Sequence, residues 1–223
     1  MDNLSNQEVK RLVQQHWDGR AIAFDDKAHH GLHSEDQHRA WLVVLNDLAG
    51  EGKRRVLDVG CGTGFLALMF AELGHDVTGV DMSTQMLQQA KQKAQQRDLL
   101  VEFRLGDAEM LAGEDNLYDL IIERHLIWTL PSPSKAVSAW MRALKTGGRL
   151  ALIEGEWGKN KNGAYQEIHT HLPFFGGKSS ETLEAFLLEK GLTDVCVQSL
   201  MEPVLWGEVP QHPRYMIVGR REA

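Results

Sequence analysis

The sequence is poor in cysteine. Its 223 residues include only two, Cys61 and Cys196, which lie far apart and belong to no Cys-x-x-Cys pair. A disulfide framework and a cysteine-rich metal site are therefore unsupported, and a reducing compartment, the cytoplasm, fits best. Histidines gather between residues 29 and 38, but they lack a standard ligand spacing, so we expect no metal site.

Long hydrophobic runs and an excess of positive charge are also lacking. No apolar run approaches the roughly 18 residues of a membrane-spanning helix, and the polar N-terminal segment contains no block typical of a secretion signal. The 24 Lys and Arg are outnumbered by 31 Asp and Glu, which gives a net charge of -7. Nucleic-acid-binding proteins usually carry a basic surface. We therefore expect neither membrane insertion nor a nucleic-acid partner.

The hydrophobic pattern predicts a single α/β domain. Short β-branched runs alternate with longer amphipathic segments from residue 55 to residue 153, which is typical of right-handed βαβ units. We expect a Rossmann-like, doubly wound, mostly parallel seven-stranded sheet with an antiparallel C-terminal hairpin and an N-terminal helical lid. The expected strands are residues 56–59, 76–80, 101–105, 117–122, 150–153, 195–200 and 215–218. The expected helices are residues 4–16, 34–48, 65–73, 84–97, 134–144 and 180–190.

The strongest functional signal is a glycine-rich loop. The segment from Val56 to Gly64 reads as a buried strand that enters Gly-Cys-Gly-Thr-Gly and then an apolar helix. Glycine allows the main chain to approach a ligand closely. Asp81 ends the next strand about twenty residues later, where a carboxylate can accept both hydroxyl protons of a ribose. Together these features predict a nucleoside-binding crevice.

Asp58 indicates which nucleoside binds. A dinucleotide loop leaves room for a pyrophosphate at the helix N-terminus. The negative charge of Asp58 would oppose a phosphate, whereas it suits an ammonium or a sulfonium. The loop from Asp58 to Gly64 resembles the signature loop of class I S-adenosylmethionine-dependent methyltransferases, and the resemblance covers roughly residues 54–155. It implies S-adenosyl-L-methionine as the cofactor.

The resemblance assigns cofactor contacts to residues that follow successive strands. Asp81 would bind the ribose, and Met82 would lie against the adenine. Asp107 would accept the adenine amino proton, and the Ala108 amide would reach a ring nitrogen. The backbone at Arg124 would accept a bond from the methionine ammonium. The expected cofactor-binding residues are Arg20, Asp58, Gly60, Cys61, Gly62, Asp81, Met82, Asp107, Ala108, Glu109 and Arg124.

Several of these residues could instead have a purely structural role. Met82 taken alone could be a core residue, and Asp107 alone could cap a helix. Arg20 lies in a segment that resembles the aromatic lid of small-molecule methyltransferases, where it would pair with the methionine carboxylate. It could equally be a solvated surface arginine.

The loop after residue 122 would flank the transferred methyl group. His125 lies in it and could act as a general base for the acceptor, or it could only pack and orient the loop. The Asp/Asn-Pro-Pro-aromatic signature of methyltransferases that act on nucleic-acid bases is missing, which favours a small-molecule acceptor. We expect the acceptor to contact Trp17, His33, Trp128, His169 and His171.

The expected organisation is one methyltransferase domain over residues 1–223. Residues 1–50 would form the helical lid, 54–156 the cofactor-binding core, 157–178 an acceptor-specificity insertion, and 179–223 the closing helix and strands. The predicted reaction is methyl transfer to oxygen, nitrogen or sulfur of a small metabolite, by a monomer or homodimer. The alternatives are a nicotinamide-dependent oxidoreductase, favoured by the glycine loop and Asp81, and a noncatalytic S-adenosylmethionine-binding module.

Overall fold

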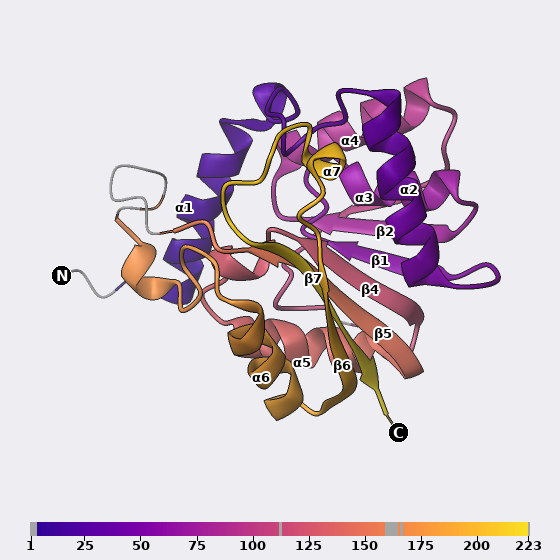
Figure 1. Ribbon diagram of the computed structural model, residues 1–223. Helices are drawn as coiled ribbons and strands as arrows, with labels where there is room; N and C mark the ends of the chain where they lie inside the picture. The colour runs from indigo at the N-terminus through magenta and orange to yellow at the C-terminus, as the bar shows by residue number, and fades with distance from the viewer. Residues whose placement is uncertain (1–3, 112, 159–164, 166, 223) are drawn as a thin grey trace.

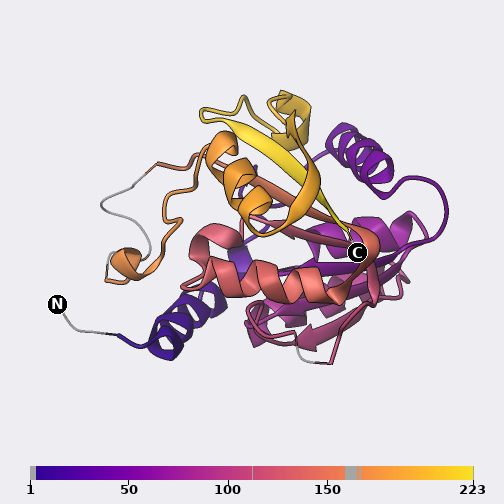
Figure 2. The same ribbon diagram turned by 90° about the horizontal axis from the view of Figure 1, so that it is seen from below.

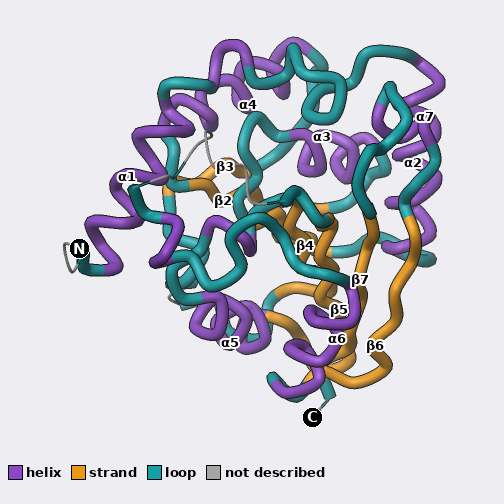
Figure 3. The backbone as a smooth tube through the Cα atoms, turned by 60° about the vertical axis from the view of Figure 1, so that its left-hand side comes forward, coloured by secondary structure: helices purple, strands orange, loops and turns teal. Residues whose placement is uncertain are grey.

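The strands form one mixed sheet. The computed structural model describes residues 4–111, 113–158, 165 and 167–222, and in that part of the chain the strand order is β3-β2-β1-β4-β5-β7-β6. Figure 3 shows the sheet with β3 and β6 at its two ends. The first five strands pair in parallel, and β7 runs antiparallel between β5 and β6. The predicted fold class is therefore confirmed. The strands are β1 (Arg55–Val59), β2 (Asp76–Asp81), β3 (Glu102–Leu105), β4 (Tyr118–Arg124), β5 (Leu144–Gly155), β6 (Leu192–Ser199) and β7 (Arg214–Arg221).

Helices cover both faces of the sheet. α2, α3 and α4 lie on one face, and α5 and α6 lie on the other, as Figures 1 and 2 show from two directions. The α-helices are α1 (Asn6–Asp18), α2 (Glu35–Ala49), α3 (Phe65–Glu72), α4 (Thr84–Gln96), α5 (Pro133–Ala143), α6 (Ser180–Glu189) and α7 (Pro203–Trp206). The short 3-10 helices are η1 (Ala21–Ala23), η2 (Ile127–Thr129) and η3 (His169–His171). None of the described helices is long and apolar enough to cross a membrane.

The core consists of two apolar layers separated by the sheet. In β1, Val56 packs with α2 and α3, whereas the next residue, Leu57, packs with α5 and α6. Both side chains are fully buried, because a central parallel strand is covered on its two faces. Buried tryptophans anchor both layers through their indole N–H groups. Trp41 donates to the carbonyl of Leu205 at 2.6 Å, and Trp140 donates to the carbonyl of Ala108 at 2.8 Å.

The lid helix α1 lies beyond the edge of the sheet where β1 and β2 end (Figure 1). Ser5 starts the helix as an N-cap with a complete capping box. Val9 and Val13 form its buried stripe and pack with Tyr165 and neighbouring residues. At its far end, Asp18 accepts a bond of 2.5 Å from the hydroxyl of Ser83, which caps α4. The lid is thus fixed to the core by both apolar and polar contacts.

The structure differs from the sequence expectations mainly at connections. β5 begins at Leu144, directly after α5, although the Thr-Gly-Gly sequence that follows predicts a turn. Its pairing with β4 is irregular between Tyr118 and Leu120, which accommodates the extra residues. α7 was not predicted, because four residues are too short for a helical pattern. Residues 159–164 and 166 of the expected insertion lie outside the described residues.

Candidate active site

The glycine loop is fixed by the strand beside it. The backbone N–H groups of Gly60 and Cys61 both donate to the carbonyl of Val80, at 2.7 and 3.0 Å. Gly60 has a φ of +67°, and a Cβ at this position would lie 2.7 Å from the Leu126 side chain. Gly62 has a φ of +53°, but a Cβ there would meet no atom within 4 Å, so it would project into open space. Both positions favour glycine because of their positive φ, and position 60 also lacks room for a side chain.

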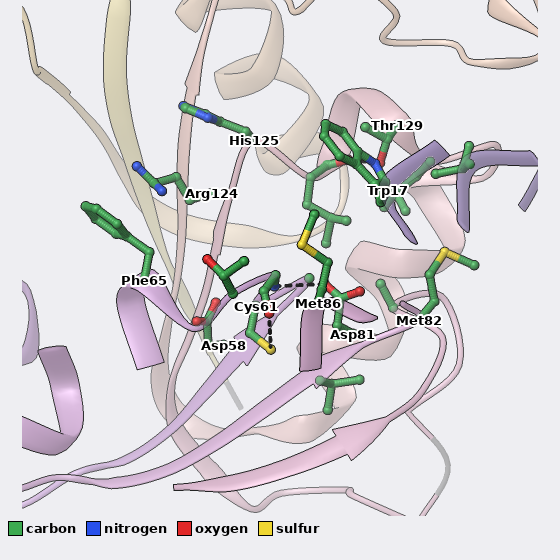
Figure 4. A pocket seen from close by; sticks show the side chains of 18 of the residues that line it. Trp17, Asp58, Cys61, Phe65, Asp81, Met82, Met86, Arg124, His125 and Thr129 are labelled. Atoms are coloured by element: carbon green, nitrogen blue, oxygen red, sulfur yellow. Dashed lines mark hydrogen bonds between the residues drawn. The ribbon is translucent and has the colours of Figure 1, made fainter. Parts of the chain in front are cut away.

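Asp81 holds this loop through its carboxylate. One oxygen accepts from the N–H of Gly62 (Figure 4) and the other from the N–H of Ser83, both at 2.8 Å. Burial raises the pKa of Asp81 to about 6, against the lowering effect of these two bonds. The carboxylate is therefore largely ionised at neutral pH and lies at the end of β2, where parallel sheets bind ligands.

Asp58 is the most buried acid of the loop, with a side chain and backbone only 2% exposed. It accepts a bond of 2.9 Å from the N–H of Ala67 in α3. Burial raises the pKa of Asp58 to about 7, and the nearby Arg124 opposes that rise. A cationic ligand beside Asp58 would favour the ionised form in the same way as Arg124 does.

A third acidic group follows β3. Asp107 accepts from the Glu109 N–H at 2.9 Å and pairs with the ammonium of Lys10 at 2.7 Å. Lys10 belongs to α1 and also pairs with Glu109 at 2.6 Å. The other Glu109 oxygen accepts from the N–H of Ser132 at 2.7 Å. Glu109 thus ties the loop together behind the cavity, whereas Asp107 and Lys10 reach its wall.

Arg124, at the end of β4, carries a positive charge into the site. Its guanidinium lies 3.6 Å from the ring centroid of Phe65 and donates to the carbonyls of His29 and His30, at 3.3 and 2.9 Å. Burial lowers the pKa of Arg124 to about 9, so the side chain stays cationic at neutral pH. These contacts hold residues 29–30 of the lid segment against the core.

His125 has a left-handed backbone, with a φ of +61°. Its ring lies 4.5 Å from the ring centroid of Trp157 and stacks on Trp206 at 5.8 Å. The Nε2 atom is buried and has no hydrogen-bond partner. Burial, followed by the charges of Arg124 and Arg214, lowers the pKa of His125 well below its usual value. The imidazole is therefore neutral at physiological pH.

These elements surround one cavity of about 290 Å³. In Figure 4, Arg124 and His125 lie on one side of it, and Trp17 and Met82 lie on the other. The predicted site residues that line the cavity are Trp17, Asp58, Gly60, Cys61, Gly62, Asp81, Met82, Asp107, Ala108, Arg124, His125 and Trp128. The structure gives the positions of these residues, and their roles in binding and catalysis stay predictions.

Other predicted site residues do not line this cavity. Arg20 is exposed, because it follows the end of α1. His33 is exposed, and its ring bonds to the carbonyl of Lys27 at 3.0 Å. His169 and His171 lie on η3, on the outer side of the segment that packs against α1, and Glu109 lies behind the wall. The structure thus does not bring these five residues to the cavity.

Several lining residues were missed by the sequence analysis. They are Lys10, Phe24, His29, His30, Phe65, Trp157 and Arg214 among others. Arg214 comes from β7, far from the loop in sequence, and no motif marks it. An isolated arginine at the start of a strand carries no functional signal, so only the folded chain could reveal it.

Comparison with known proteins identifies the family. Residues 57–152 match the family described as methyltransferase domain. The chain is 36% identical over 97 residues to a ubiquinone biosynthesis O-methyltransferase of Coxiella burnetii, covering 44% of this chain and 42% of that protein. It is 30% identical over 152 residues to a protein of the same name from Roseobacter denitrificans, covering 67% and 60%. The chain thus spans about half the length of the curated relatives it matches.

Solved structures share the fold. A phosphoethanolamine N-methyltransferase 2 of Haemonchus contortus, in complex with phosphomonomethylethanolamine and S-adenosylhomocysteine, aligns with a TM-score of 0.72 at 19% identity. The alignment covers 99% of this chain and 61% of that one. The cyclase SpnF aligns with the same TM-score at 20% identity over 95% of both chains. With the glycine loop and its acidic partners in place, this chain belongs to the class I S-adenosylmethionine-dependent methyltransferases.

Proposed function

We propose that this protein transfers the methyl group of S-adenosylmethionine to an oxygen, nitrogen or sulfur atom of a small-molecule metabolite. The observation that carries the proposal is the convergence of Asp58, Asp81 and Asp107 on one cavity, each at or near the carboxyl end of a successive strand. Carboxylates at these points complement an ammonium, a ribose and an adenine amino group. The curated relatives named above are O-methyltransferases, which makes oxygen the first acceptor atom to test.

The residues present fit the cofactor. The open space beyond Gly62 is where a ligand can touch the backbone, because a side chain there would fill it. Asp81 would hold the ribose hydroxyls, and Asp58 would face the cationic end of the methionine part. Asp107 would meet the adenine, next to Met82 and Ala108. Lys10 already pairs with Asp107 at 2.7 Å, so the lid helix would close over the adenine end.

The cofactor supplies a methyl group on a sulfonium, which an acceptor displaces in line. The protein contributes mostly by holding the acceptor about 3 Å from that carbon, since correct placement alone removes much of the barrier. The walls from Trp17, Trp128 and Trp157 exclude water and confine the acceptor. Little acid-base machinery is needed for such a displacement.

His125 would take the acceptor's proton where one must leave. Its imidazole is neutral at physiological pH and is therefore in the form that can accept a proton. The same low pKa makes it a weak base. We therefore assign most of the rate to placement and a smaller share to His125.

The first test is binding. Calorimetry should show saturable binding of S-adenosylhomocysteine and none of NAD. Binding of NAD alone would support the nicotinamide-dependent oxidoreductase instead, although Asp58 opposes a pyrophosphate.

The second test is turnover. The protein would be incubated with labelled S-adenosylmethionine and a metabolite extract, and labelled products would be identified by mass spectrometry. The likeness to a cyclase shows that this fold does not require methyl transfer, so this test is necessary. Cofactor binding without any labelled product would favour the noncatalytic module.

The proposal includes the setting of the reaction. Cys61 and Cys196 are both free thiols, which suits the reducing cytoplasm. The net charge of -7 disfavours nucleic acid as a substrate. We propose a monomer or a homodimer. Among the described residues, no group of three His, Cys, Asp or Glu side chains is close enough to hold a metal ion.

A further inference from the structure

Arg214 lines the cavity, and the proposed function gives its positive charge no role. It is the first residue of β7 and pairs with Gly155 at the end of β5. Its guanidinium carbon lies 3.8 Å from the ring centroid of Trp157 and 4.9 Å from that of Trp206. The two indoles hold the guanidinium in place at the cavity wall by cation–π contact.

The Arg214 side chain has no anionic partner among the described residues. Its Nε and Nη1 atoms are buried and make no hydrogen bond. The carboxyl groups that act on it are Glu154 and Glu208, neither of which forms an ion pair with it. Burial and the adjacent Glu123 raise the pKa of Glu154 well above its usual range, so Glu154 is neutral. Glu208 is exposed and lies 3.8 Å from His29.

An uncompensated buried cation is costly. Burial lowers the pKa of Arg214 to about 10, so the group remains charged at neutral pH. Leaving its donors unsatisfied destabilises the protein, and a bound anion would relieve that cost. Guanidinium donors form a fork that matches a carboxylate or a phosphate in bidentate geometry.

The surroundings strengthen the preference for an anion. Arg124 lines the same side of the cavity and is bonded to carbonyls rather than to a carboxylate. His29 and His30 also line it, and burial lowers the pKa of both, so they are neutral and add no positive charge. The positive charge of this half of the cavity therefore comes from Arg124 and Arg214, whereas Asp81 and Asp107 make the other half negative.

The position of Arg214 in the sheet separates it from the cofactor loop. The order β1-β4-β5-β7 places three strand spacings between the glycine loop and Arg214. At about 4.8 Å per spacing, the backbones are roughly 14 Å apart. The nucleoside side of the cavity lies over β1, β2 and β3, so Arg214 lies on the opposite, acceptor side.

We propose that Arg214 is a specificity-determining residue that binds an oxyanion, a carboxylate or a phosphate, carried by the methyl acceptor. This inference rests on the proposed function and deepens it, because it specifies the chemical class of the substrate. Trp157, Phe24 and Phe65 add aromatic walls around the cavity, which suits an acceptor with a flat apolar part.

The test uses three small probes titrated calorimetrically into the full-length protein, with and without saturating S-adenosylhomocysteine. Benzoate and phenyl phosphate carry the two possible oxyanions, and benzamide is the neutral match of benzoate. We expect at least one oxyanion to bind about tenfold or more tightly than benzamide. The preferred probe distinguishes a carboxylate from a phosphate acceptor. Equal affinity for benzamide, or no binding of either oxyanion, would overturn the proposal.

Variants connect this preference to the residue. Arg214→Met should lower oxyanion affinity about tenfold or more, and Arg214→Lys should restore part of it. Arg220→Met is the matched control, since Arg220 is an exposed arginine of the same strand, and it should bind as the wild type does. Unchanged oxyanion binding by Arg214→Met would refute the assignment.

The cofactor gives an independent readout. Arg214→Met should bind S-adenosylhomocysteine with wild-type affinity. A large loss there would mean that Arg214 holds the methionine carboxylate, and the proposal would be wrong. Failure of the wild type to bind S-adenosylhomocysteine at all would instead refute the proposed function, while the probe titrations without cofactor would still report on the oxyanion site.

Discussion

Replacement of Asp81 by alanine tests the cofactor site most directly. The carboxylate makes two bonds of 2.8 Å, to the N–H groups of Gly62 and Ser83. Its removal leaves the Gly62 N–H without an acceptor and deprives the ribose of its charged partner. A hydrogen bond to a charged group contributes about 1.5–3 kcal/mol, so we expect S-adenosylhomocysteine to bind roughly 10- to 150-fold more weakly.

The assay is calorimetric titration of S-adenosylhomocysteine at pH 8, where the Asp81 carboxylate is ionised because its pKa is about 6. Asp76→Ala is the control. Asp76 lies at the opposite end of β2, and its ion-pair partner among the described residues is the exposed Lys53, at 2.7 Å. It should change binding by little, since exposed ion pairs contribute about 0–1 kcal/mol to stability and this one is remote from the cavity.

The wild type adds a pH dependence to the same experiment. Protonation of Asp81 removes the charge that the ribose needs, so affinity should fall as the pH drops through about 6. Circular dichroism would verify that both variants are folded. Wild-type affinity in a folded Asp81→Ala protein would refute the assignment of this carboxylate to the cofactor.

Further predictions concern the loop, the base and stability. Gly60→Ala should unfold or inactivate the protein more than Gly62→Ala, because only the first Cβ would collide with the core; equal melting temperatures would contradict this. His125→Ala should lower turnover by about 10²-fold or more if it removes the acceptor's proton, with cofactor affinity unchanged; a wild-type kcat would exclude that role. Burial raises the pKa of Asp58 to about 7 and raises that of Glu123 too, so the native state holds protons that the unfolded chain has lost. The melting temperature should therefore fall between pH 6.5 and 8.5, and less so in Glu123→Gln; a rise would refute this reasoning.

Much of the fold was predictable because its signals are local. The buried strand at residues 56–59, the glycine loop and the carboxylate of Asp81 follow one another in sequence, and the structure joins them by short hydrogen bonds. The lid helix was also predictable from its apolar spacing and the Ser5 cap. The start of β5 was not, because its Gly-rich residues predict a turn and only pairing with β4 makes them a strand.

The candidate site was predictable only for residues that lie at the ends of the strands. Arg20 lies within the predicted lid, yet the end of α1 leaves it exposed. Lys10, in contrast, reaches Asp107 from the same helix, and nothing in the sequence pairs these residues. Contacts between segments about 100 residues apart depend on how the lid packs, which a single sequence pattern does not encode.

The sequence by itself determined the order of the elements, the glycine loop and the acids at the carboxyl ends of β1, β2 and β3, because these depend on backbone preference and hydrophobic period. The tertiary structure determined which titratable side chains are charged. It buries Glu154 beside Glu123 and so neutralises it, and it leaves Arg214 cationic between two indoles. The protonation state of a side chain depends on its burial and on the charges around it. Both are established only when segments distant in sequence pack together.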